Sequence, residues 1–275
     1  MRIRTVDAFT DQPYSGNPAG VVLLDEADFP AGFPDDERLQ QLAAELNLAE
    51  TAFALRLRED AADWALRWFT PAVEVGLCGH ATLATAHVLH QDGHAQERVR
   101  FRTRSGLLTT EATPDGSGHT LDFPTAALAL VEPPEGLRAA LGAPVRKVHT
   151  TGDLGDLVVE VEDEATVRAL APDLAAVAAL PCRGVAVTAE AGAGAEYDFV
   201  SRFFAPAQGI PEDPVTGSAH TALAPLWAER LGRAELVGLQ CSRRTGLVRT
   251  EVLGGRTRLT GAAVTVLDAE LRVPL

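Results

Sequence analysis

Two short segments of this chain place a polar residue directly after a glycine, at the start of an apolar, alanine-rich run. His80 follows Gly79 in the first segment, and Ser218 follows Gly217 in the second. Such runs predict helices. The first turn of a helix presents unpaired backbone N–H groups and the positive end of the helix dipole, which bind an anion without a cationic side chain. The pattern therefore predicts a site for a small carboxylate. The alternative is that both segments are ordinary helix caps.

Both helix starts belong to a longer internal repeat. An Arg–aromatic–Phe–x–Pro segment precedes each of them, at residues 67–71 and 202–206. A second pair of matching segments, RSGLL at 104–108 and RTGLV at 244–248, follows them at nearly equal spacing. Two agreements in the same order predict two homologous halves. Because binding sites form preferentially between domains, we expect both helix starts to line one cleft.

The elements that must position these residues indicate an α+β protein. Stretches with strand patterns outnumber helices and short links join them, so we expect mostly antiparallel, curved sheets, each rolled around one central helix. The central helices are predicted at residues 79–90 and 217–231. A length of 275 residues suits two domains. The alanine- and proline-rich stretch 123–134 marks the crossover. This predicts domains at 1–126 and 127–275, with the last strand free to pack back on the first domain.

Local patterns define the surroundings of Glu50, a candidate acid or base. Residues 16–20 predict a turn ahead of an apolar strand, and Asp35 or its neighbour predicts the cap of a helix. Glu50 then lies where that helix gives way to the next strand. Farther along, residues 99–110 predict one strand with a glycine irregularity.

Composition narrows the classes of partner. A net charge of −14, without any Lys/Arg-rich run, argues against nucleic acid. No run of 18 apolar residues occurs, so no membrane span is predicted. The first residues carry no apolar signal region, and three cysteines at no metal-like spacing indicate free thiols in a reducing compartment. We expect a cytoplasmic protein without a bound metal.

Three histidines raise an alternative in which a metal binds. His87, His90 and His94 share one predicted helix at a spacing that can hold a metal ion. The glutamate of the H-E-x-x-H pattern is missing from this segment, so a solvated helix face is the preferred interpretation.

Five segments together resemble one protein family. They are DAFT at 7–10, GNPAG at 16–20, ETAF at 50–53, CGHAT at 78–82 and EDPVTGSAH at 212–220. In this order, across almost the whole chain, they are similar to the PhzF, or phenazine biosynthesis-like, family of isomerases. The resemblance implies the diaminopimelate-epimerase fold, which has two pseudo-symmetric domains with the active site between them. It also implies no metal or organic cofactor, and a homodimer.

The resemblance assigns roles to single residues as well. It implies that Glu50 is the general base and acid, which moves a proton between two carbons of a small carboxylate substrate. His80 and Asp213 would position the substrate and assist the proton. A physical argument supports Glu50, because a carboxylate that apolar neighbours withdraw from water holds a proton more tightly and so becomes a stronger base. The implied substrate-binding residues are Asn17, Gly79, Ala81, Gly217 and Ser218.

Each of these polar residues has a simpler interpretation. Glu50 would be a solvated residue at a helix end, and His80 a polar helix cap. Asp213 would be a turn residue before Pro214, and Asn17 would bond its own backbone.

Two other functions compete with the isomerase. A racemase with one thiol on each face of a stereocentre needs a cysteine before each repeated glycine. Cys78 precedes Gly79, but Thr216 precedes Gly217. One thiol cannot serve both faces, so Cys78 is interpreted as a small buried residue. A non-catalytic carboxylate-binding protein would keep both helix starts without needing Glu50. The sequence does not name the substrate, and phenazine synthesis need not be involved.

Overall fold

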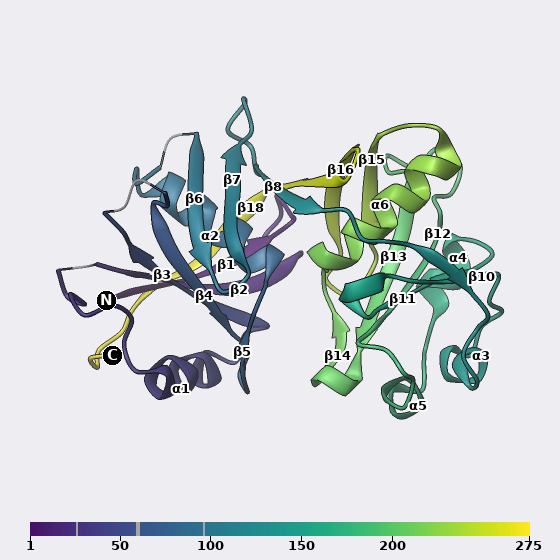
Figure 1. The fold of residues 1–275 in the computed structure, drawn as a ribbon, viewed down its shortest axis with the longest axis horizontal. Helices are drawn as coiled ribbons and strands as arrows, with labels where there is room; N and C mark the ends of the chain where they lie inside the picture. Colours follow the sequence, from purple (N-terminus) through teal and green to yellow (C-terminus); the bar gives the residue numbers. More distant parts are fainter. Residues whose placement is uncertain (26, 59–60, 96) are drawn as a thin grey trace. The chain divides into compact units, whose positions relative to one another are not determined.

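Two compact units make up the chain in the computed structural model (Figure 1). Unit 1 comprises residues 1–122 and 260–275, and unit 2 comprises residues 123–259. The predicted boundary between residues 126 and 127 lies close to this division. The structure describes residues 1–25, 27–58, 61–95 and 97–275.

Unit 1 is a mixed sheet with one central helix. Its strands are β1 (Arg2–Ala8), β2 (Asn17–Leu24), β3 (Glu50–Arg56), β4 (Trp64–Phe69), β5 (Glu74–Val75), β6 (Arg98–Thr103), β7 (Gly106–Ala112) and β18 (Ala263–Glu270). The pairs β1/β2, β3/β4, β4/β5 and β6/β7 are antiparallel, whereas β2/β3 and β4/β6 are parallel. The last strand, β18, pairs antiparallel with β1, so the end of the chain completes the sheet of unit 1.

The helix α2 (Gly79–Gln91) forms the centre of unit 1 (Figure 1). Every residue from 80 to 86 is buried, as are Val88 and Leu89, and the helix packs on β1, β2, β3 and β18. A helix that is apolar on all sides is a buried helix, and its alanines leave room for the surrounding strands. The second helix, α1 (Asp36–Leu46), is amphipathic and buries only Leu39, Leu42 and Ala43. Its place outside the sheet follows from that narrow apolar stripe.

Unit 2 has the same kind of architecture around α6 (Gly217–Leu231). Its strands are β9 (Ala129–Val131), β10 (Lys147–Thr150), β11 (Leu157–Glu160), β12 (Val185–Glu190), β13 (Phe199–Ala205), β14 (Ile210–Asp213), β15 (Glu235–Gln240) and β16 (Gly246–Leu253). Three short helices, α3 (Leu137–Leu141), α4 (Glu164–Ala169) and α5 (Leu174–Ala178), lie outside the centre, while β8 (His119–Pro124) and β17 (Arg256–Gly261) cross the division between the units. In the part of the chain that the structure describes, no helix is both long and apolar enough to cross a membrane.

The strand pairings of unit 2 repeat those of unit 1. β11/β12 are parallel like β2/β3, and β13/β15 are parallel like β4/β6. β12/β13, β13/β14 and β15/β16 are antiparallel, like β3/β4, β4/β5 and β6/β7. The predicted fold class, α+β with two pseudo-symmetric halves, is confirmed.

An equivalent ion pair in each unit explains the repeated Arg–aromatic–Phe segment. Arg67 Nε donates to Glu74 Oε1 at 2.8 Å, and Arg202 Nε donates to Glu212 Oε1 at 2.7 Å. Each guanidinium also lies over the phenylalanine ring two residues later, at 5.1 and 4.9 Å from the ring centroid. The motif therefore links β4 to β5 in unit 1 and β13 to β14 in unit 2. In the sequence, each linked pair precedes the central helix of its unit.

Two local predictions were wrong, and a third was right in position only. Residues 17–20 are the first half of β2 rather than a turn, because Gly16 alone takes the left-handed φ of 63° and Asn17 already pairs with Ala8. Residues 99–110 are not one strand but the β6/β7 hairpin, in which Gly106, at φ 101°, closes the turn. Asp35 occupies the N-cap position of α1, yet its side chain makes no cap bond to the described residues.

Because the imidazole of His220 is buried, we expect the stability of unit 2 to fall at acidic pH. His220 is 0% exposed, and its Nδ1 donates to the carbonyl of Thr216 at 2.8 Å. No described residue partners its Nε2. Burial lowers the pKa of His220 to about 4, although the bond to Thr216 opposes this. The unfolded chain binds a proton near pH 6.5, so the folded state loses stability as the pH falls from 6.5 toward 4.

Between pH 7 and pH 5, this single group is expected to lower the free energy of unfolding by about 2 kcal/mol. Urea denaturation of the wild type and of His220→Gln at both pH values measures the effect. The expected result is that the variant loses about 2 kcal/mol less than the wild type over this range. Equal losses in both proteins would show that His220 does not titrate in this way.

Candidate functional site

Three of the predicted site residues come together in unit 1. Asn17 is the first residue of β2, Glu50 is the first residue of β3, and His80 is the second residue of α2. The parallel register sets Ala19 beside Glu50, and α2 packs on both strands. The start of the helix therefore lies against the starts of the two strands.

The imidazole of His80 links the other two side chains. Its Nε2 lies 3.0 Å from Oε2 of Glu50, and its Nδ1 lies 3.2 Å from Nδ2 of Asn17. The side chains of His80 and Glu50 are 5% and 12% exposed, and Asn17 is fully buried. Glu50 is thus not a solvated helix end, and the His80 side chain does not cap the helix. Their catalytic roles stay predictions.

Burial and charge act in opposite directions on His80. Burial lowers its pKa, but the neighbouring Cys78 and Glu50 raise it well above the ordinary value of a histidine. Burial raises the pKa of the Cys78 thiol to about 11. The side-chain amide of Asn17 suits either protonation state of His80. Rotating the amide by a half turn places its oxygen, an acceptor, beside Nδ1 of His80 in place of its nitrogen, a donor.

Cys78 belongs to the same cluster, which the sequence did not predict. It is the N-cap residue of α2 and is 6% exposed. Its Sγ lies 3.5 Å from Nδ1 and 3.9 Å from Nε2 of His80. The residue is buried, as expected, but the thiol contacts an ionisable ring instead of filling apolar space. Its position two residues before His80 at a helix start was the available signal.

The other predicted site residues of unit 1 contribute backbone N–H groups rather than side chains. Gly79 and Ala81 lie in the first turn of α2, and the N-cap side chain makes no cap bond to the described residues. The first turn therefore directs N–H groups toward the cluster.

In unit 2, Asp213 forms a hydrogen bond with Thr216, the residue that precedes α6. Its Oδ2 accepts a bond from Oγ1 of Thr216 at 2.6 Å, and its backbone carbonyl accepts one from Gln240 at 2.7 Å. The side-chain Oε1 of Gln240 in turn accepts a bond from the backbone N–H of Thr216 at 2.8 Å. Asp213 is thus the last residue of a strand that is fixed to the helix start, rather than only a turn residue before Pro214.

Ser218 lies beside a cation that the sequence did not predict. Arg183 Nη2 donates to Oγ of Ser218 at 3.1 Å, while Nε and Nη2 bond Asp156 at 2.9 and 2.5 Å. The Arg183 side chain is 39% exposed, and that of Asp156 is 1% exposed. Burial raises the pKa of Asp156 more than Arg183 lowers it. Gly217 and Ser218 therefore begin a helix that has a guanidinium beside it.

The register identifies matching positions in the two halves. Thr51 pairs with Phe69 in unit 1, and Val185 pairs with Phe204 in unit 2, so Gly184 is the counterpart of Glu50. A Cβ at Gly184 would lie 2.4 Å from Cζ of Phe203, so no side chain fits there without a shift of that ring. The acid at this position is present in unit 1 only.

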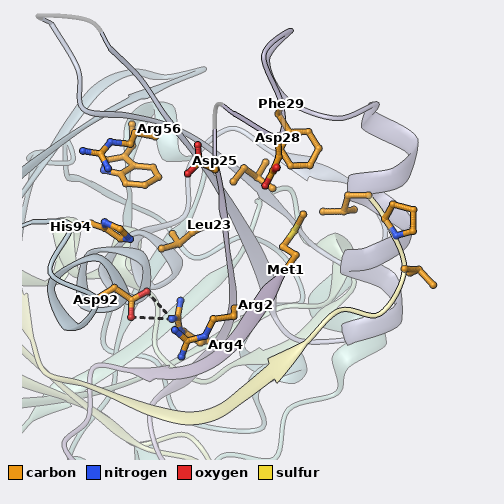
Figure 2. Close-up of a pocket in the computed structure, with 15 residues that line it drawn as sticks. Met1, Arg2, Arg4, Leu23, Asp25, Asp28, Phe29, Arg56, Asp92 and His94 are labelled. Carbon is orange, nitrogen blue, oxygen red and sulfur yellow. Dashed lines mark hydrogen bonds and ion pairs between the residues drawn. The ribbon is translucent and has the colours of Figure 1, made fainter.

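A cavity of about 600 Å³ occurs elsewhere in unit 1 (Figure 2). Residues at both ends of the chain line it, including Met1 and Leu275, and so do Arg4 and Asp92, which form an ion pair. None of the clustered residues described above lines it. Cavity volume therefore does not identify the candidate site. The buried carboxyl group of Glu50 and the buried imidazole of His80 identify it.

Comparisons with known proteins cover nearly the whole chain. Residues 6–269 match the model of a family described as phenazine biosynthesis-like protein. An uncharacterized isomerase of Pseudomonas aeruginosa is 47% identical over 274 residues, which are 99% of either chain. The crystal structure of a phenazine biosynthesis protein of the PhzF family from Enterococcus faecalis is 36% identical with a TM-score of 0.88, and 99% of each chain is covered. A hydroxyproline epimerase from Agrobacterium vitis shares the fold at 15% identity, with a TM-score of 0.61 over 98% of this chain and 91% of that one.

Proposed function

Since this chain belongs to the phenazine biosynthesis-like family, we propose that it is an isomerase that moves a proton between two carbons of a small carboxylate. One observation carries the proposal: the buried Glu50 carboxylate lies 3.0 Å from the imidazole of His80, beside the start of α2. A base with restricted access to water is suited to proton abstraction from carbon, and the imidazole beside it favours the ionised form that accepts the proton.

The proposed step conserves atoms and electrons. Glu50 takes a proton from a C–H bond that a neighbouring unsaturated group acidifies, and the electron pair stays on the substrate, spread over that group. Glu50 then returns the proton to a different carbon, which completes the isomerisation without an oxidant or reductant. His80 stabilises the Glu50 carboxylate before the first transfer and after the second. No metal or organic cofactor is required by this chemistry.

We propose that backbone amides bind the substrate carboxylate. The first turn of α2, with Gly79 and Ala81, offers N–H groups and the positive end of the helix dipole. For unit 2 we propose that Gly217 and the Ser218 hydroxyl bind a carboxylate in the same way. Asn17 would fix the orientation of His80, and Asp213 that of the α6 start.

Two observations favour this mechanism over a two-base racemase. The counterpart of Glu50 is Gly184, so the second half supplies no acid at that position. The counterpart of Cys78 is Thr216, whose hydroxyl bonds Asp213. One half therefore carries the reactive acid, and the other half lacks both an equivalent acid and an equivalent thiol.

Hydrogen exchange tests the proposed function directly. The enzyme is incubated in deuterated water with small unsaturated acids, after dialysis against a chelator, and deuterium and isomer formation are followed by NMR and mass spectrometry. We expect deuterium at carbon in at least one acid, and much slower exchange in its methyl ester. No exchange in any acid would support the non-catalytic binding protein instead.

The family resemblance also supports a homodimer and a cytoplasmic location as parts of the proposal. Light scattering on the purified protein tests the first, and cell fractionation tests the second.

A further inference from the structure

We propose that Glu50, Cys78 and His80 together form a binding site for a zinc ion. Each residue offers one ligand atom, and the three atoms lie within 4.8 Å of one another. Oε2 of Glu50 is 3.0 Å from Nε2 of His80, and Sγ of Cys78 is 3.9 Å from the same nitrogen. Ligand atoms around a tetrahedral zinc ion are roughly 3.3 to 3.6 Å apart, given bonds of about 2.0 to 2.3 Å. Sγ also lies 3.5 Å from Nδ1, so the Cys78 or His80 side chain would have to rotate to bring the sulfur and the Nε2 lone pair to one ion.

The charges in the cluster favour a divalent cation. A thiolate and a carboxylate neutralise two positive charges, so the loaded site is neutral, which suits its burial. The positive end of α2 opposes any cation, and the two anionic ligands must offset it. When zinc binds, the thiol proton and the Nε2 proton pass to solvent.

Sulfur makes the site selective. A thiolate with an imidazole and a carboxylate prefers zinc to magnesium or calcium, which bind oxygen ligands. Three protein ligands leave a fourth tetrahedral position for water or for a substrate carboxylate. The expected ligand is thus zinc or another thiophilic divalent ion.

A second histidine cluster in unit 1 competes as a metal site. The ring of His119 lies 6.2 Å from that of His87 and 5.9 Å from that of His90. However, Nε2 of His87 already bonds Thr265 at 3.2 Å, and these three residues do not gather their ligand atoms as Glu50, Cys78 and His80 do. The ring of His94, the third histidine of that spacing, lies 6.0 Å from the ring of Trp64 and is tilted by 58° to it.

Zinc at this site would inhibit the enzyme, a consequence that rests on the proposed function. The ion would occupy the oxygen of Glu50 that has to accept the substrate proton. Binding itself rests only on the geometry of the three side chains. The two parts can therefore be measured separately.

Cobalt titration of the chelator-treated protein tests binding without any activity assay. A Co²⁺ ion bound to a thiolate gives a near-ultraviolet charge-transfer band, which one equivalent of Zn²⁺ should abolish. We expect Cys78→Ser to remove the band, and Glu50→Gln to keep it but weaken binding by at least about 10- to 100-fold. The matched controls Cys182→Ser and His90→Gln should bind like the wild type.

The outcomes separate the two proposals. A missing band, a band that survives Cys78→Ser, or one that disappears in His90→Gln would overturn the zinc site. If the band forms but the metal-free protein exchanges no substrate hydrogen, the zinc site stands and the proposed function fails. If exchange occurs, equimolar Zn²⁺ should stop it and a chelator should restore it.

Discussion

Replacement of Glu50 by glutamine is expected to lower the rate of substrate hydrogen exchange by about 10²- to 10⁴-fold, the usual contribution of a general base. The amide keeps the size of the side chain but cannot accept a proton from carbon. The loss should appear in kcat rather than in KM, because substrate binding is assigned to the helix amides. Deuterium incorporation under saturating substrate measures it.

Two controls accompany the Glu50→Gln variant. Glu45→Gln changes an exposed glutamate of α1 and should leave exchange unchanged. An NMR titration of His80 provides a readout other than activity. Because the Glu50 carboxylate helps to raise the pKa of His80, that pKa should fall in the variant. Exchange at the wild-type rate in Glu50→Gln would remove Glu50 from the mechanism.

The second large effect is expected in unit 2, where Arg183→Met leaves the buried carboxylate of Asp156 without its cation. Breaking a fully buried pair costs about 3–5 kcal/mol. Arg183 is 39% exposed, so a smaller loss of about 2–3 kcal/mol is expected near pH 8. Urea denaturation measures the loss.

The pH dependence gives this prediction a distinct signature. Without Arg183, burial acts unopposed on Asp156, whose pKa is already raised. A carboxyl whose pKa is raised in the folded state stabilises the fold at low pH and loses this contribution as the pH rises. The variant should therefore lose least at pH 5 and most at pH 8. The double variant Arg183→Met/Asp156→Asn should recover stability, and the exposed pair variant Arg146→Met should stay within about 0.5 kcal/mol of the wild type. A loss independent of pH would contradict the assignment.

Local sequence alone was sufficient for the two central helices. Gly79 and Gly217 begin α2 and α6 as predicted, and left-handed glycines at 93 and 232 follow their ends. Alanine favours the helix and glycine marks its end, so the local sequence was enough to locate both helices. The repeat and the short motifs also identified the family, because ordered motifs survive without knowledge of the contacts between them.

Short or irregular strands depended on distant partners. β15 was not predicted, because Gly238 interrupts its apolar pattern. In the structure the ring of Phe199 occupies the space beside that glycine, where a Cβ would lie 2.5 Å from Cζ. The same holds for Asn17, which is a strand residue only because Ala8 pairs with it. Such strands form through pairing energy rather than through local propensity.

By itself, the sequence determined the duplication, the fold class, the helix starts and the types of residue that could do chemistry. Only the tertiary structure decided which of them meet. Glu50 joins His80 and Cys78 across 28 or more residues of chain, and Arg183 reaches Ser218 from a separate loop. The physical reason is that helix and turn signals act over a few residues of sequence. A buried charge, in contrast, needs a partner because burial removes its water, and that partner can come from any part of the chain.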